Sequence, residues 1–128
     1  MNLLLDTHLL LWAAGRPDRL SIRARRLITA SDNQLLFSSA SLWEIAVKNA
    51  LKRPDFNVDT RRLWRLLLAH GYRELPVSSE HAIAVESLRD IHKDPFDRML
   101  VAQARSDGLL LLTADKTVAA YGEGVRKV

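Results

Sequence analysis

Short runs of consecutive apolar residues recur along the chain, and each is followed by a stretch with helical spacing. These runs predict strands at Leu3–Leu5, Leu35–Phe37, Glu74–Val77 and Leu109–Leu112, with a weaker strand at Val125–Val128. Because the runs do not alternate with polar residues, we expect strands buried on both faces, as in a parallel sheet between helices. The pattern therefore predicts an α/β fold in which a small parallel sheet is flanked by helices (α/β/α).

Capping residues mark the boundaries of the predicted helices. Asp59 is placed to cap a helix that ends at Gly71. Ser79 precedes a shorter stretch with one apolar helical face. Asp94, followed by the proline that is favoured in a first turn, opens a helix that ends at Gly108.

The length and composition of the chain limit the kinds of chemistry it can perform. Its 128 residues are 48% hydrophobic and 27% charged, so we expect one globular domain spanning residues 1–128. Cysteine is absent, which excludes thiol nucleophiles and cysteine-bound zinc and suits a reducing cytoplasm. No apolar stretch approaches the about 18 residues of a membrane span, so we expect no membrane association. The net charge of +4 permits a polyanionic partner without requiring one.

Acidic residues fall at equivalent places in successive strand and helix units. Asp6 ends the first predicted strand, and Asp115 follows the strand Leu109–Leu112. Glu44 and Asp97 each lie in the first turn of a predicted helix. Because strand carboxyl ends and helix amino ends share one edge of a parallel sheet, we expect these carboxylates to converge there.

Carboxylates gathered in this way repel one another and require a compensating positive charge. Two unit charges about 4 Å apart repel by roughly 4 kcal/mol at an effective dielectric constant near 20. Mg²⁺ and Mn²⁺ prefer oxygen ligands, so the cluster indicates one of these ions rather than zinc. Since such ions assist phosphodiester hydrolysis, the cluster predicts a metal-dependent nuclease site.

Each acidic residue also has a purely structural interpretation. Asp6 and Asp115 can cap the helices that follow them. Glu44 matches a capping box with Ser41, in which the glutamate would only accept a hydrogen bond from the Ser41 amide. Four independent caps would not explain why the acids recur at the same end of successive units, and this recurrence favours a site.

Other polar and aromatic residues are given structural interpretations at this stage. Asp94 and Asp97 occupy the N-cap and third positions of one helix, so either can be structural. His92 lies near Asp94 and is interpreted as a solvated loop residue. The tryptophans at helical apolar positions are interpreted as core or interface residues rather than platforms for base stacking. They are Trp12, Trp43 and Trp64.

Apolar helix stretches suggest that the chain self-associates. The segments Leu9–Trp12 and Leu63–Leu68 carry more apolar residues than we expect one small core to need. Apolar patches of that kind commonly mark interfaces. We therefore expect a homodimer.

Four segments of the chain resemble the successive motifs of PIN-domain ribonucleases, specifically the VapC-type toxins of bacterial toxin–antitoxin pairs. They are Leu4–Trp12, Ser39–Ala46, Asp94–Ala104 and Leu112–Asp115, in the family's order. The resemblance implies a Mg²⁺- or Mn²⁺-dependent endoribonuclease with an RNA substrate, usually homodimeric and inhibited by a cognate antitoxin protein. It further implies that operator DNA is bound only through the antitoxin complex.

The resemblance also assigns roles to individual residues. It implies that Asp6, Glu44, Asp97 and Asp115 bind the metal, with Thr113 as a supporting polar group in the active site. Thr7 is a second candidate for such support. Two aspartates, Asp94 and Asp97, lie close together in the third of these segments. We choose Asp97 as the metal ligand, because Asp94 is better explained as the cap ahead of a proline.

Two other functions fit the same acidic cluster. The first is a non-catalytic interaction module in which a metal ion serves stability and the apolar helix faces bind a partner. The second is a flap-type DNA nuclease with similar metal chemistry. Nuclease assays on RNA and DNA, with and without divalent metal, separate these functions from an endoribonuclease.

Overall fold

Strands and helices alternate along the chain in the computed structural model, which describes all of residues 1–128. The strands are β1 (Asn2–Leu5), β2 (Gln34–Ser38), β3 (Arg73–Leu75), β4 (Leu110–Thr113) and β5 (Val125–Lys127). The α-helices are α1 (Thr7–Gly15), α2 (Ile22–Thr29), α3 (Ser39–Ala50), α4 (Thr60–Ala69), α5 (Ser79–Ala84), α6 (Pro95–Asp107) and α7 (Lys116–Ala119). Short 3₁₀ turns follow α1 and α5, at Pro17–Arg19 and Val85–Ser87. None of the helices combines the length and apolarity needed to cross a membrane.

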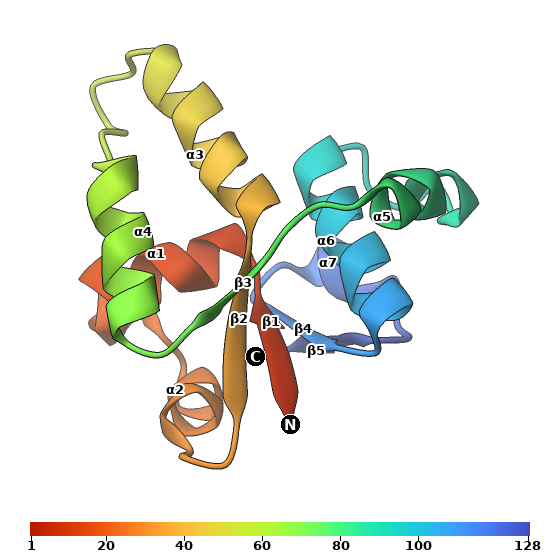
Figure 1. Cartoon of the computed structure of the whole chain (residues 1–128), viewed down its shortest axis with the longest axis horizontal. Helices are drawn as coiled ribbons and strands as arrows, with labels where there is room; N and C mark the ends of the chain where they lie inside the picture. The colour runs from red at the N-terminus through yellow and green to blue at the C-terminus, as the bar shows by residue number, and fades with distance from the viewer.

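The strands form one parallel sheet of five, in the order β3-β2-β1-β4-β5. In the central strand, Leu4 pairs with Leu36 on one side and with Leu111 on the other. The chain builds outward from β1 to β3 and then returns to place β4 beside β1 (Figure 1). In open α/β sheets, ligands bind outside the carboxyl ends of the strands at such a reversal.

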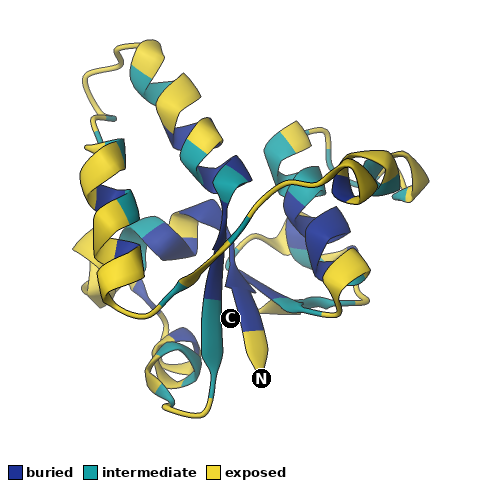
Figure 2. Ribbon diagram, in the orientation of Figure 1, coloured by how far each residue is buried: buried dark blue, intermediate teal, exposed yellow.

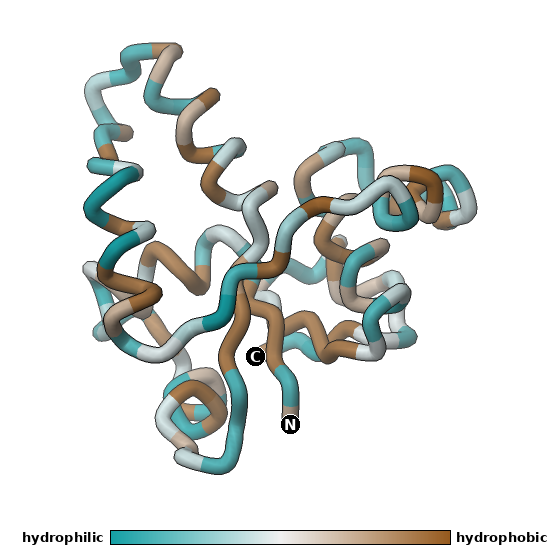
Figure 3. Tube along the Cα trace, viewed as in Figure 1, coloured by the Kyte–Doolittle hydropathy of each residue, from teal (hydrophilic) through white to brown (hydrophobic).

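Helices cover both faces of the sheet, as the uninterrupted apolar runs predicted. Leu3 and Leu5 pack with residues of α1, α2, α3 and α4, whereas Leu4 packs with residues of α6 and α7. The central strands are largely buried in Figure 2 and largely hydrophobic in Figure 3. Every residue of β1 after the first is fully buried, so a run without polar alternation is stable there.

The predicted boundaries are confirmed at several helix ends and wrong at one strand. Asp94 caps α6, and Gly108 ends it in the left-handed conformation, with φ of 65°. Asp59 caps α4. The strand expected to reach Val77 ends at Leu75 instead, because Pro76 has no amide hydrogen to continue the ladder.

The apolar stretches that suggested self-association are largely part of the core. Leu9 and Leu10 of α1 are buried, as are Leu63 and Leu67 of α4. Leu66 and Leu68 of α4 are exposed, so the core accounts for only part of these stretches. A second exposed apolar stripe runs along α3 to the residue that caps its carboxyl end. Its residues are Trp43, Val47 and Leu51.

Candidate active site

The predicted acidic residues lie at the carboxyl edge of the sheet. Asp6 directly follows β1, and Asp115 follows β4, the two strands at which the sheet order reverses. Glu44 lies on α3, which leaves β2 without an intervening loop, and Asp97 lies in the first turn of α6. The elements that bring them together appear in Figure 1, where α3 extends beyond the end of β2 and α6 runs alongside the sheet.

Asp6 is both a helix cap and a buried carboxylate of the cluster. Its Oδ1 accepts a hydrogen bond from the Leu9 amide at 3.0 Å, and its Oδ2 accepts one from the Thr113 hydroxyl at 2.5 Å. Only 3% of its surface is exposed, and burial raises the pKa of the Asp6 carboxyl despite these two bonds. Thr113 Oγ1 also accepts the Asp115 amide at 3.0 Å, so this side chain connects the ends of β1 and β4.

Glu44 is not part of the capping box that its spacing from Ser41 suggested. Helix α3 begins three residues earlier than that interpretation requires, because the Ser38 side chain caps it by accepting the Ala40 amide at 3.0 Å. Glu44 therefore lies in the second turn rather than the first. Ser41 lies inside the helix and is 1% exposed.

The Glu44 carboxylate is held by two side chains instead. The Thr7 hydroxyl donates to Oε1 at 2.7 Å and lies 2.9 Å from Ser41 Oγ. On the other oxygen, Lys48 Nζ forms an ion pair with Oε2 at 2.7 Å, one helical turn along α3. Glu44 itself is 3% exposed, so these contacts fix a buried carboxylate.

Asp97 shows most directly that the carboxylates are close together. Burial, followed by the negative charge of neighbouring carboxylates, raises the pKa of Asp97 from 3.8 to about 7. In decreasing order of effect these neighbours are Asp94, Glu44, Asp6 and Asp115. The Asp94 side chain accepts the amides of Phe96 and Asp97, at 2.8 and 3.3 Å, as expected for the N-cap.

His92 belongs to this site, contrary to its interpretation as a solvated loop residue. Its Nδ1 accepts the Asp94 amide at 3.1 Å, which places the hydrogen of the neutral ring on Nε2. Nε2 lies 3.2 Å from Asp97 Oδ2 and 3.9 Å from Asp115 Oδ2. The only signal in the sequence was its position two residues before the cap of α6.

The donor atoms of this edge fit a hard divalent cation. Oxygen ligands from carboxylates are those that Mg²⁺ and Mn²⁺ prefer. His92, Asp97 and Asp115 each offer an atom within 4.8 Å of the others, and two further buried carboxylates lie nearby. The mutual repulsion that raises the pKa of Asp97 is the kind that a bound cation relieves.

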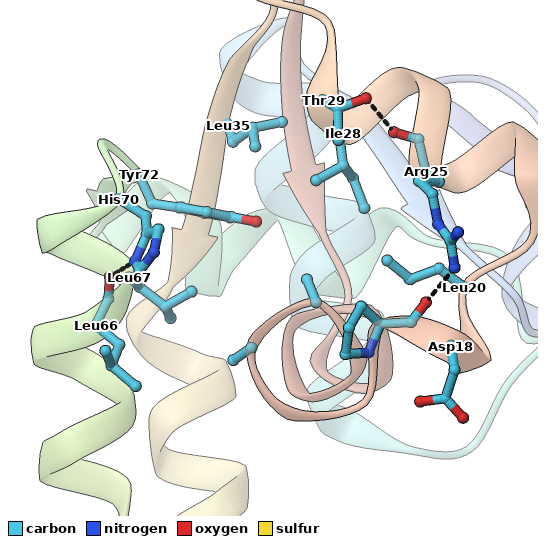
Figure 4. A pocket seen from close by; sticks show the side chains of 13 residues that line it. Asp18, Leu20, Arg25, Ile28, Thr29, Leu35, Leu66, Leu67, His70 and Tyr72 are labelled. Carbon is cyan, nitrogen blue, oxygen red and sulfur yellow. Dashed lines mark hydrogen bonds between the residues drawn. The ribbon is translucent and has the colours of Figure 1, made fainter.

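Two hollows of different character open on the surface near α1. A groove of about 210 Å³ adjoins the acids and is lined by Asp6, His8, Trp12, Ala114 and Asp115. A larger cavity of about 660 Å³ lies between the end of α1, α2 and α4, beside the amino ends of β2 and β3 (Figure 4). Its lining is mostly apolar and contains none of the clustered carboxylates, so the candidate metal site lies outside this larger cavity.

Comparisons with known proteins concern the family and the fold of the chain. The chain is 29% identical over 121 residues to ribonuclease VapC22 of Mycobacterium tuberculosis, which covers 94% of this chain and 92% of that protein. A solved structure of VapBC2 from Rickettsia felis, bound to a DNA fragment from its promoter, superposes with a TM-score of 0.73. It is 14% identical and covers 100% of this chain and 99% of that one.

A second solved structure shares the same fold. VapC20 of Mycobacterium tuberculosis, described as a sarcin–ricin loop cleaving toxin, superposes with a TM-score of 0.61 and 21% identity, covering 94% of this chain and 95% of that one. A family model of the PIN domain matches residues 3–124, a span that contains all the acidic residues of the site. The protein therefore belongs to the PIN-domain family.

Proposed function

We propose that this protein is a divalent-metal-dependent endoribonuclease that acts as the toxin of a toxin–antitoxin pair. The observation that carries the proposal is the convergence of carboxylates at the reversal of the sheet, where carboxylate oxygens of Asp97 and Asp115 lie within 4.8 Å of each other and the buried Asp6 and Glu44 lie nearby. The name of its relative VapC22, a ribonuclease, supports RNA as the substrate. On this proposal residues 1–128 form one nuclease domain.

The proposed metal ligands are Asp6, Glu44, Asp97 and Asp115, which would hold Mg²⁺ or Mn²⁺. When bound, such an ion stabilises negative charge on a phosphodiester and promotes ionisation of water, so hydrolysis needs no side-chain nucleophile. His92 is a positioning residue rather than a ligand, because its Nε2 carries the ring hydrogen and lies within reach of Asp97 and Asp115 as a donor.

Other side chains of the chain position these carboxylates. Thr113 holds Asp6 by its hydroxyl, and the same oxygen orients the backbone at Asp115. Thr7 and Lys48 hold the two oxygens of Glu44. Since each buried carboxylate is fixed through specific atoms, the site is organised before substrate arrives.

The proposed partners follow from the similar complexes. The VapBC2 structure, which contains promoter DNA, supports a cognate antitoxin protein and contact with operator DNA only through the antitoxin complex. We also propose a homodimer, with the exposed stripe Trp43, Val47 and Leu51 on α3 as part of its interface. An RNA substrate and a protein antitoxin imply that the protein acts in the cytoplasm.

The decisive experiment identifies cleaved RNA directly. Inducing the wild-type protein in a bacterial host and sequencing newly formed RNA ends should reveal discrete cuts, which Asp97→Asn abolishes. The purified protein should then cut the identified RNA with Mg²⁺ or Mn²⁺ and not with EDTA. Cleavage of DNA instead would indicate a flap-type nuclease. Metal binding with no cleavage of either nucleic acid would indicate an interaction module.

Metal binding can be measured independently of the RNA target. A ligand that binds only the folded state stabilises it by RT ln(1 + [L]/Kd), about 2.7 kcal/mol at a hundredfold excess over Kd. Saturating Mn²⁺ should therefore raise the melting temperature of the wild type by several degrees, and that of Asp97→Asn by much less. An equal rise in both proteins would remove Asp97 from the ligand set.

A further inference from the structure

The small groove beside the acidic cluster contains two aromatic rings that the metal site does not use. His8 and Trp12 lie one helical turn apart on α1 and line the groove with Asp6, Ala114 and Asp115. The His8 imidazole is exposed, and His8 lies two residues after Asp6 in the lining of the same groove. The groove therefore leads directly from two proposed ligands onto an aromatic surface.

Trp12 is held as a fixed surface rather than as a mobile side chain. It is half-buried and packs against the main apolar cluster of the sheet. The ring centroids of Trp12 and His8 lie 6.1 Å apart with an interplanar angle of 42°, so the imidazole does not stack on the indole. The part of the indole that faces the groove can therefore take another ring.

The size and lining of the groove restrict what that ring can be. Its volume of about 210 Å³ is below the roughly 300–1,000 Å³ of pockets for drug-sized ligands, so it suits one ring system. The two carboxylates at its inner end exclude an anionic group there, except one bridged to them by a cation. A nucleotide meets both conditions, because its phosphate can bind at the cation while its base reaches the indole.

We propose that this groove is a nucleotide subsite in which Trp12 stacks against the base next to the phosphodiester being cut. His8 lies at its rim and offers a hydrogen bond to the sugar or phosphate of the same nucleotide. This inference rests on the proposed function and adds a substrate requirement to it. Stacking of this kind needs an unpaired base, so the cut must lie in a single-stranded or looped part of the RNA.

Mononucleotides test the subsite without knowledge of the RNA target, because an endonuclease cannot cut them. With Mg²⁺ present, adenosine 5′-monophosphate should bind the wild type more tightly than ribose 5-phosphate, which lacks the base. Binding should quench tryptophan fluorescence. Trp12→Leu should weaken adenosine 5′-monophosphate binding by about 5- to 100-fold, as expected for the loss of one stacked base. The same change should leave ribose 5-phosphate binding unaltered.

Matched variants separate stacking from a loss of structure. Trp12→Phe keeps an aromatic face, so it should retain most of the affinity for adenosine 5′-monophosphate but lose the quenching of tryptophan fluorescence. Trp64→Phe on α4 should keep both the affinity and the quenching. His8→Ala should weaken binding by about 2- to 10-fold, the effect of one hydrogen bond. If Trp12→Leu fails to fold, two measurements still test the subsite. They are the binding of Trp12→Phe and the comparison of adenosine 5′-monophosphate with ribose 5-phosphate on the wild type.

The outcomes distinguish this inference from the proposed function. If the wild type cuts RNA and binds ribose 5-phosphate, but binds adenosine 5′-monophosphate no more tightly, the subsite is wrong and the nuclease stands. Equal binding of adenosine 5′-monophosphate by wild type and Trp12→Leu leads to the same conclusion. If the wild type neither binds either ligand nor cuts RNA, both proposals fail.

Discussion

The two hollows at opposite ends of α1 differ in every property that matters for chemistry. The groove at its amino end is small and is lined by the carboxylates of Asp6 and Asp115, whereas the cavity at its carboxyl end is about three times larger and mostly apolar. In the groove, Asp6 begins the helix as its cap; in the cavity, Ala13 and Ala14 near the end of the helix form part of the wall. One short helix thus contributes to two unlike surfaces.

This difference has its origin in the parallel sheet. The carboxyl ends of β1 and β4 and the amino ends of α1, α6 and α7 meet at one edge, where loops are short and polar side chains converge. At the opposite end, α2 and α4 flank the sheet and leave space between apolar side chains. The volume of a hollow therefore depends on how the helices are spaced, and the position of the acidic side chains depends on where the strands end.

The largest expected effect tests whether activity belongs to the acidic end alone. Asp97→Asn should lower RNA cleavage by more than about 100-fold, because changes to groups that only support metal ligands already cost 10- to 100-fold. Asp18→Asn replaces an exposed aspartate of the apolar cavity and should leave the rate unchanged. The cleavage rates of both variants are measured on the RNA that sequencing of the newly formed ends identifies. A comparable loss in Asp18→Asn would break the distinction between the two hollows.

The pH dependence of stability should also differ between the two ends. In metal-free protein the pKa of Asp97 rises from 3.8 to about 7, so the folded state binds the extra proton between these values. The stability that this proton gives is complete below about pH 4 and is lost as the pH rises through about 7. Asp97→Asn is neutral throughout, so its advantage in melting temperature over the wild type should grow from pH 5 to pH 8.

Melting curves in EDTA at several pH values provide this measurement. Asp18→Asn serves as the control, because its melting temperature should stay parallel to that of the wild type. A constant difference between Asp97→Asn and the wild type across the range would mean that the Asp97 pKa is not raised.

A single buried hydroxyl gives a smaller effect. Thr7→Val leaves Glu44 Oε1 without its donor, and an unsatisfied buried acceptor costs about 1–3 kcal/mol. We expect a lower free energy of unfolding, measured by urea denaturation, together with about tenfold slower cleavage as Glu44 loses its orientation. Thr29→Val is the matched control at the apolar cavity, where the hydroxyl bonds only to the exposed carbonyl of Arg25. Equal losses of stability and of cleavage rate in both variants would show that Thr7 does not position Glu44.

The smallest effects should come from adding volume to each hollow. Ala14→Val narrows the apolar cavity and should change stability by less than about 0.5 kcal/mol and cleavage not at all. Ala114→Val narrows the acidic groove and should raise the KM for RNA several-fold if a nucleotide binds there. Steady-state kinetics distinguish the two. The reverse pattern would place substrate binding at the apolar cavity.

The sequence by itself determined the architecture and the location of the site. Uninterrupted apolar runs such as Leu3–Leu5 can only be stable when both faces of a strand are covered, and this requirement produces a parallel sheet. Local capping chemistry placed Asp94 and Gly108 at the ends of α6. The common location of Asp6, Asp97 and Asp115 then follows, because residues that lie after a strand or at the start of the next helix share one edge of the sheet.

Only the tertiary structure decided how the acids are held and which other residues join them. Glu44 matched a local capping box in the sequence, yet its partner Thr7 lies 37 residues away on another helix. The His92 side chain lies near Asp115, although α6 and β4 separate the two residues along the chain. Trp12 lines one groove together with Asp6 and Asp115. Contacts between distant segments leave no local pattern along the chain, because they depend on how packed helices orient side chains around the sheet.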